Sequence, residues 1–293
     1  MHRWNNQLKT VLLLGALSAV LIAMGGMLGT TSLYAFTVLA VVLNLGAYFF
    51  SDRLVLRLHG AREVGPEEVP RLHQTVADVA HAAGIPTPRV FWMDDDHANA
   101  FATGRNPKRG VVAVTRGIVE LLTPRELRAV LAHELAHIRN RDILVATIAA
   151  AITAAVTYSA QALQFSAVFG GAQHDEEHEQ GAAGSGLLLA LVAPLAAMLI
   201  QLGVSRSREL HADETGAMVS GDPLGLASAL QKLERSAEAI SPEVPQLATA
   251  SLFIVNPLRA GSWTMSLFST HPATTQRVHR LLGLARKWQR VAA

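Results

Sequence analysis

The chain has 293 residues, of which 50% are hydrophobic and only 16% are charged, and its mean hydropathy is +0.27. The apolar residues are gathered into long runs, so we expect a membrane protein. The absence of cysteine excludes a disulfide framework and any thiolate metal ligand. A net charge of +2, with no basic patch interleaved with aromatic residues, gives no support for a nucleic-acid partner.

The N-terminal segment, residues 1–51, carries no Asp, Glu, Lys or Arg from Thr10 onward. Glycines and threonines divide it into two apolar runs, at about 11–28 and 33–50. Each run is close to the roughly 20 residues that span a bilayer, so the segment predicts a transmembrane hairpin. A cleaved signal peptide is the alternative, but no clear cleavage site follows the first run and a second run begins at once.

Residues 52–142 are charged and punctuated by prolines, which is typical of a folded segment in water. Their patterns predict an amphipathic helix over 70–83, a strand over 89–93, and a β-hairpin formed by 98–102 and 110–115. We expect these elements to form the first part of an α+β domain.

The stretch from Val130 to Asp142 contains the pattern H-E-x-x-H at His133, Glu134 and His137. On a helix, positions i and i+4 share one face, so both imidazoles can bind one ion. Glu134 can then reach a water on that ion and act as a general base, as in zinc metallopeptidases.

The same residues have a simpler interpretation, as two ordinary histidines and a solvated glutamate on a helix. Two local features oppose it. Thr123-Pro124-Arg125-Glu126 provides an N-cap, a proline in the first turn and an acid three residues after the cap. The flanking residues are apolar, so the helix is expected to be buried, and buried histidines and glutamates need partners.

Residues 143–204 contain two further apolar runs, at about 143–167 and 186–204, with a short acidic loop at 170–185. We expect transmembrane helices 3 and 4, continuous with the metal-binding helices beside them. Arg and Lys flank the runs on the side of residues 52–142, while the loops on the other side have none. The positive-inside rule therefore places both termini and residues 52–142 in the cytoplasm.

The last segment, residues 205–293, offers a third ligand for a catalytic zinc, which takes three protein ligands. Glu209 and Asp213 are four residues apart and share a helical face. Glu209 would complete a His₂Glu site, and Asp213 would accept the free N–H of a ligating histidine. A solvated acidic face is the alternative, and His211 is a rival ligand on a different face. Further helices are predicted over 222–239 and 275–290.

Several motifs together resemble the HtpX family of membrane zinc metallopeptidases. They are H-E-L-A-H-x-x-x-x-D at 133–142, S-R-x-x-E-x-x-A-D at 205–213, N-A-F-A at 99–102, and S-T-H-P at 269–272 followed by Arg277. The resemblance covers most of the chain, including the order of the four apolar runs. The acidic run at 174–179 matches no motif of the family.

The resemblance implies a gluzincin fold, one Zn²⁺ per chain, and an active site facing the cytoplasm on the bacterial inner membrane. It implies endopeptidase activity against misfolded or damaged membrane proteins, as part of protein quality control and the stress response. His133, His137 and Glu209 would be the ligands and Glu134 the catalytic carboxylate. Asp213 and Asp142 would support the ligating histidines.

Further candidate roles fall on His271, Arg277 and the segment before the motif helix. His271 is a candidate donor to the oxyanion, although a structural histidine before Pro272 explains it equally well. Arg277 could serve the oxyanion, bind substrate or hold a carboxylate. The strand at 110–115 or the segment containing Asn99, Ala100 and Phe101 could bind the substrate as an added β-strand.

The expected fold is an α+β multi-pass membrane protein, with a predominantly helical zincin-like catalytic domain, a small β-sheet and about four transmembrane helices. Its expected partners are polypeptide substrates and the lipid bilayer. The alternative is a catalytically inactive, zinc-stabilised membrane chaperone or adaptor, which loss of Glu134 would favour. A transporter is disfavoured because the apolar runs contain no ionisable residue.

Overall fold

The computed structural model describes residues 29–144, 146–148, 206–239 and 272–292, with a few isolated positions before residue 29. The first and fourth apolar runs, most of the third, the acidic loop and His271 lie outside the described residues. The expected number of about four transmembrane helices therefore stays a prediction.

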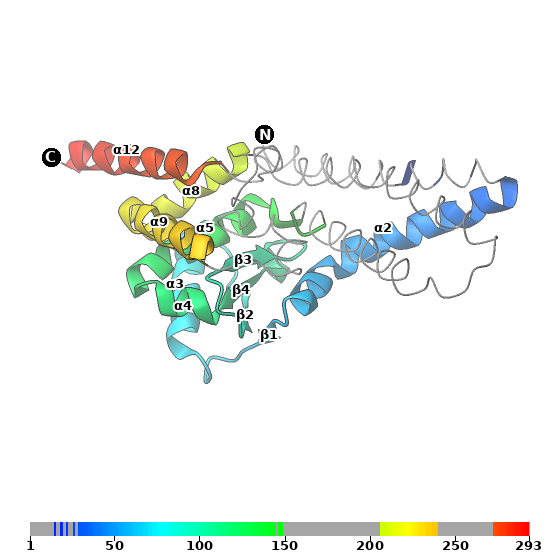
Figure 1. The fold of residues 1–293 in the computed structure, drawn as a ribbon, viewed down its shortest axis with the longest axis horizontal. Coiled ribbons are helices and arrows are strands. Elements are labelled where there is room, and N and C mark those ends of the chain that lie inside the picture. Colours follow the sequence, from blue (N-terminus) through cyan, green and yellow to red (C-terminus); the bar gives the residue numbers. More distant parts are fainter. Residues whose placement is uncertain are drawn as a thin grey trace.

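Helix α2 (Thr30–Leu58) projects from the rest of the molecule (Figure 1) and is long and apolar enough to cross a membrane. It is the one such helix among the residues the structure describes, and only 6% of its most apolar window is buried. Its exposed apolar side chains include Tyr34, Val38, Leu39, Val41, Val42, Leu43, Leu45, Tyr48, Phe49 and Phe50. A helix that is apolar on all sides and unburied is suited to lipid. It continues past the expected segment boundary at residue 51, without a break.

Four strands form one small mixed sheet in the order β1-β2-β4-β3. Their bounds are β1 (Arg62–Glu63), β2 (Arg89–Met93), β3 (Ala100–Thr103) and β4 (Val111–Thr115). Strands β3 and β4 form the predicted antiparallel hairpin, and its connection contains a short 3₁₀ turn, η1 (Pro107–Arg109). Strand β2 pairs with β4 in parallel, so β3 is left at the edge of the sheet.

Alternate residues of the strands pack on opposite faces of this sheet. Val112 and Val114 join the main core with helices α3 (Pro70–Ala83) and α5 (Pro124–Asn140). Phe91, Phe101 and Ala113 face the other way, toward Val55 and Leu56 at the end of α2. The sheet therefore separates the C-terminal end of α2 from the helix that carries the H-E-x-x-H motif.

Four further helices complete the part of the chain that the structure describes. They are α4 (Arg116–Leu121), α8 (Arg206–Ser220), α9 (Pro223–Ala239) and α12 (Thr274–Ala292). Figure 1 shows α8 crossing α5, with α9 and α12 outside them. The predicted helices at 70–83, 222–239 and 275–290 are all present, with small changes of boundary, whereas β1 and α4 were not predicted.

The expectation that the motif helix continues into the third apolar run is wrong. Helix α5 ends at Asn140, and Arg141 adopts a left-handed conformation with φ 60°. The backbone is helical again from Ile143, and the carbonyl of Asp142 accepts a hydrogen bond from the N–H of Ala146 at 3.3 Å. Arg141 thus ends one helix and Asp142 begins the next, and the side chain of Asp142 is directed back toward His137 of α5.

Candidate metal centre

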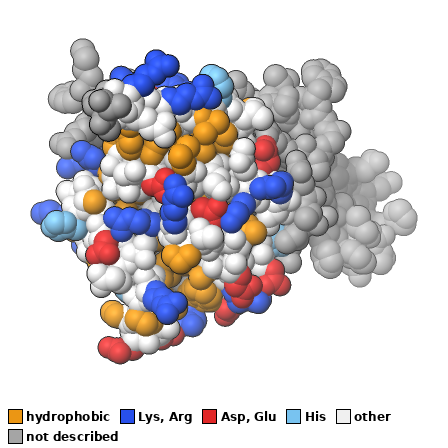
Figure 2. Space-filling model, turned by 90° about the vertical axis from the view of Figure 1, so that its left-hand side faces the viewer, with side chains coloured by type: hydrophobic (Ala, Val, Ile, Leu, Met, Phe, Trp, Pro, Cys, Tyr) orange, Lys and Arg blue, Asp and Glu red, His pale blue; other side chains and the backbone are white. Residues whose placement is uncertain are grey.

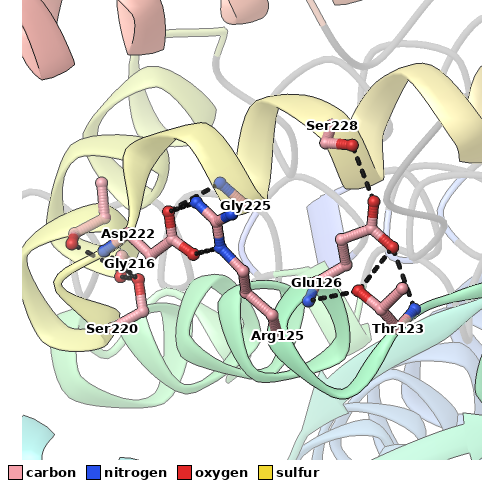
Figure 3. A network of polar contacts seen from close by, with 9 residues as sticks. Thr123, Arg125, Glu126, Gly216, Ser220, Asp222, Gly225 and Ser228 are labelled. Atoms are coloured by element: carbon pink, nitrogen blue, oxygen red, sulfur yellow. Dashed lines mark hydrogen bonds and ion pairs between the residues drawn. The ribbon is translucent and has the colours of Figure 1, made fainter.

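Side-chain contacts fix the N-terminal turn of helix α5, which precedes the residues of the H-E-x-x-H motif. Thr123 and Glu126 form a reciprocal capping box, and the same Glu126 carboxylate accepts hydrogen bonds from Ser228 Oγ and Lys232 Nζ, each at 2.7 Å. Figure 3 shows Glu126 of α5 reaching Ser228 of α9, and Arg125 of α5 pairing through two nitrogens with Asp222, the residue just before α9. These contacts fix the position of α5 relative to α9.

A glycine lets α8 approach α5 closely. A Cβ atom at Gly216 would lie 2.8 Å from both the backbone nitrogen and the Cα of His133. Such a contact is shorter than side chains tolerate, so only glycine allows this spacing of the two helices. The close approach brings Glu209 and Asp213, which lie on α8 before this glycine, against the two histidines of α5.

The three predicted ligands converge. The Nε2 atoms of His133 and His137 are 3.3 Å apart, and they lie 3.7 Å and 3.6 Å from the two carboxylate oxygens of Glu209. One donor atom from each residue can be chosen so that all lie within 4.8 Å of one another. Two nitrogens bound at about 2.05 Å to a tetrahedral ion would be about 3.3 Å apart, so the donor set fits a metal ion such as zinc.

A carboxylate lies behind each histidine. Asp142 Oδ2 is 3.1 Å from Nδ1 of His137, and Asp213 Oδ1 is 3.0 Å from Nδ1 of His133. A carboxylate that accepts the N–H of Nδ1 leaves the lone pair on Nε2, the atom that faces the other ligands. Both aspartates are buried, and of the two contacts the one between Asp142 and His137 has the geometry of a hydrogen bond. The support of the two histidines by these carboxylates stays a prediction.

The second aspartate is itself held by Arg277, which is 1% exposed. Its Nε and terminal nitrogen donate to Asp213 Oδ2 at 2.9 Å and Oδ1 at 2.7 Å. The same terminal nitrogen lies 3.4 Å from Nε2 of His133. Of the roles left open for Arg277, the structure shows it binding a carboxylate, from a position that also borders the metal-binding atoms.

Glu134 is buried on α5 beside the ligands, and its Oε2 accepts a hydrogen bond from the backbone N–H of Ala102 at 3.0 Å. Burial raises the pKa of Glu134 to about 8. For His137, burial lowers the pKa, but the charges of Asp142, Glu209 and Glu134 outweigh that effect and raise it to about 10. A cluster of carboxylates that holds a proton this firmly is a site that favours a cation.

The predicted substrate segment lies on β3 and just before it, and its side chains point into the core. Asn99, Ala100 and Phe101 are each 2% exposed or less. The backbone of Asn99 is tied to Thr115, and the ring of Phe101 packs at 5.3 Å from that of His59. This segment contacts Glu134 through its backbone, by the N–H of Ala102.

The sequence motif at 99–102 includes Ala102, but its contact with Glu134 was not predicted, and neither was the role of Gly216. The contact of Ala102 is a backbone contact, which leaves no side-chain signal. Gly216 stands in the middle of an otherwise good helix, seven residues after Glu209. A glycine there is a weak signal for close packing that could have been used.

Two imidazoles and one carboxylate around a common point, with a second carboxylate one residue after the first imidazole, are the site of a metallopeptidase. The comparisons with known proteins agree. A family model described as Peptidase family M48 matches residues 66–285.

Relatives named Protease HtpX homolog match nearly the full chain. The protein of Persephonella marina is 48% identical over 96% of this chain and 98% of its own length. Those of Aquifex aeolicus and Ralstonia nicotianae are 46% and 45% identical, over 92% and 96% of this chain and 90% and 97% of their own lengths. The chain therefore belongs to the HtpX group of peptidase family M48, as the motifs predicted, and it is a metalloprotease that acts on polypeptides.

A solved structure, the crystal structure of S. mikatae Ste24p, matches with a TM-score of 0.49 and 17% identity, over 96% of this chain and 66% of the other. A likeness at this level does not by itself establish a shared fold.

Proposed function

We propose that this protein is a zinc-dependent endopeptidase of the bacterial inner membrane, which cleaves misfolded or damaged membrane proteins on the cytoplasmic side. The convergence of His133, His137 and Glu209 beside a buried Glu134 is the observation that carries the proposal. The all-nitrogen-and-oxygen donor set and the 3.3 Å separation of the two Nε2 atoms fit zinc. Bound there, zinc would activate water and polarise the scissile carbonyl.

Glu134 is the proposed general base. Its carboxylate lies within the ligand cluster, with one oxygen held by the N–H of Ala102 at 3.0 Å. A carboxylate fixed in this way can accept a proton from the attacking water and pass it to the leaving amine.

The edge strand β3 is the proposed place for the substrate backbone. β3 pairs with β4 along one side, and no described strand pairs with its other side. The N–H of Ala102 points to that open side, because it reaches Glu134 rather than β4. An extended peptide added there by main-chain hydrogen bonds would lie next to the proposed base, with little demand on its sequence.

Membrane attachment is supported by α2 and by the distribution of charge. Among the described residues α2 alone is suited to cross a bilayer, and basic residues flank its end nearest the sheet. The positive-inside rule then places the metal centre in the cytoplasm. Substrates that are membrane proteins would reach such a site close to the bilayer surface.

Substitution of the base tests the proposal. Glu134→Gln in the full chain in detergent should keep zinc near one per chain, while cleavage of an unfolded substrate such as casein falls by several orders of magnitude. Glu209→Gln should instead lose zinc, because it removes a ligand. Cleavage retained by the Glu134→Gln protein would refute the assigned base, and unchanged zinc binding by the Glu209→Gln protein would refute the ligand set.

The Glu134→Gln variant also distinguishes the protease from the second candidate function, an inactive zinc-stabilised chaperone or adaptor. A chaperone would suppress aggregation of a substrate equally well with or without the carboxylate of Glu134. The presence of Glu134, buried and hydrogen-bonded beside the ligands, favours the protease.

A further inference from the structure

A basic cavity lies on the opposite side of the sheet from α5, at the foot of α2. It has a volume of about 560 Å³ and is bounded by the end of α2, the first residues of β2 and the loop between β3 and β4. Small-molecule sites typically occupy roughly 300–1,000 Å³. The cavity therefore has room for a ligand, and the sheet separates it from the metal centre.

Its walls carry charge of almost one sign. Six cationic side chains line it, namely Arg53, Arg57, Arg89, Arg105, Lys108 and Arg109, against one acid, Asp52. Arg89 is paired with Glu63 at 3.2 Å, but no ion pair among the described residues involves Arg57, Lys108 or Arg109. The face of the molecule in Figure 2 is different, because there Lys and Arg are interspersed with Asp and Glu. Positive charge is therefore concentrated in the cavity, whereas that face carries both signs of charge side by side.

Aromatic residues of α2 indicate the depth of the cavity relative to a bilayer. Phe49 forms part of its wall, and the guanidinium of Arg105 lies 4.9 Å from the centre of that ring. Arg53 lies 5.6 Å from the centre of the Phe50 ring. Phe50 is the last residue of the second apolar run, and the guanidinium of Arg105 also lies 6.0 Å from the centre of the Tyr48 ring. Tyrosine rings near the end of a membrane helix are typical of the headgroup level.

We propose that this cavity binds the phosphate of an anionic membrane lipid. The proposal rests on α2 crossing the bilayer, which is part of the proposed function. A cluster of cations at the end of a membrane helix attracts anionic headgroups, and a lipid supplies its phosphate at the level where Phe49 and Arg105 meet. The loop that supplies three of the cations connects β3 with β4, so the bound lipid would also contact the hairpin whose edge adjoins Glu134.

The test measures binding, with the full-length protein in neutral detergent. Short-chain phosphatidylglycerol and phosphatidylcholine with the same acyl chains are titrated while Tm is followed, and an apparent Kd is taken from the shift. We expect phosphatidylglycerol to raise Tm far more than phosphatidylcholine does. The double variant Arg57→Gln/Lys108→Gln should bind it roughly 30-fold more weakly, about 1 kcal/mol for each cation removed.

The matched control removes two exposed cations far from the cavity, in Arg71→Gln/Arg235→Gln, and should bind like the wild type. Asp52→Asn should bind about five-fold more tightly, because it removes the one acid, and damage to the fold would not produce a gain. Casein cleavage in detergent should be the same in all these variants, so failure of the lipid site is distinguishable from failure of the protease assignment.

Equal shifts with the two lipids would overturn the proposal, as would an equal loss of binding in the control variant. Inorganic phosphate or an acidic soluble peptide that stabilises the protein as strongly as phosphatidylglycerol, at the same concentration, would also overturn it. Either result would assign the cavity to a soluble anion.

Discussion

Three carboxylates lie beside the imidazoles of His133 and His137, and each faces different ring nitrogens. Glu209 faces both Nε2 atoms, Asp142 faces Nδ1 of His137, and Asp213 faces Nδ1 of His133. Asp213 in turn pairs with Arg277. Burial alone would raise the pKa of the Asp213 carboxyl, but the charge and hydrogen bonds of Arg277 keep it far below its ordinary value. Metal affinity is therefore expected to depend on residues that do not touch the metal.

Arg277→Lys tests this dependence. Lysine keeps the positive charge but cannot donate two parallel hydrogen bonds to Asp213, so His133 loses its fixed orientation. We expect zinc affinity to fall about 10- to 100-fold, measured by competition with a chelator. Arg280→Lys, on the same helix and paired with exposed Glu214 at 2.6 Å, is the control and should bind zinc normally. An unchanged affinity in Arg277→Lys would show that the aspartate needs no such partner.

Gly216→Ala should disturb the same site through the backbone. Its new Cβ would meet the backbone of His133 at 2.8 Å, so α8 must move away from α5. We expect a loss of about 1–3 kcal/mol in stability together with weaker zinc binding. At Gly283 on α12 an added Cβ meets nothing within 4 Å, so Gly283→Ala should be neutral or stabilising by about 0.5–1 kcal/mol. Thermal unfolding in detergent measures both, and similar results for the two would contradict the packing argument.

At the scale of single residues, the convergence of His133, His137 and Glu209 could be predicted because spacing and residue type encode it. His133 and His137 are one helical turn apart, and Glu209 and Asp213 repeat that spacing. The contacts of Ala102 and Arg277 could not be predicted in the same way. They join positions 32 and 64 residues from their partners, and only the packing of the elements decides which atoms meet.

At the scale of elements, α5 depends on the network at its first turn. Burial raises the pKa of Glu126, but hydrogen bonds from Lys232, Ser228 and Thr123 outweigh it and lower the pKa to about 2. The native state thus binds this proton less tightly than the unfolded chain, where the ordinary value is 4.5. The stabilisation is full above about pH 4.5 and is lost as the pH falls toward 2.

Glu126→Gln should therefore destabilise the protein by up to about 3 kcal/mol at pH 7, since each pKa unit corresponds to about 1.4 kcal/mol. The difference in the free energy of unfolding between Glu126→Gln and the wild type should become smaller as the pH is lowered from 4.5. Chemical unfolding in detergent at several pH values measures it. Glu120→Gln, at an exposed position of α4, is the control and should change little at any pH. A destabilisation of Glu126→Gln that did not vary with pH would contradict the role of the charge.

Element prediction succeeded where local signals agree with the packing. The capping residues before α5, the glycine that ends α3, and the alternation in β3 and β4 each mark a boundary or a face in the sequence. It failed at Arg141 because the left-handed residue there is not a glycine and stands between two helical stretches. Strand β1 is two residues long and is defined only by its pairing with β2, so it has no pattern of its own.

At the scale of the whole molecule, the sheet is covered on one face by the foot of α2 and on the other by α5. This arrangement places the metal centre one layer of structure away from the proposed membrane helix. We expect cleavage sites in a membrane-protein substrate to cluster in segments within about 20 residues of its membrane spans. Mass spectrometry of the products in proteoliposomes measures their positions. Cuts distributed evenly through distant soluble domains would contradict this placement.

The link between α5 and the next helical stretch is only two residues long, and both residues have a structural role. Arg141 ends α5 in a left-handed conformation, and Asp142 reaches His137 while its carbonyl starts the following turn. An insertion of a single residue here would leave every letter of H-E-x-x-H intact and still remove the carboxylate from its histidine. Genome surveys that score proteases by that short signature alone would count such a chain as active, so the length of this link is a useful second criterion.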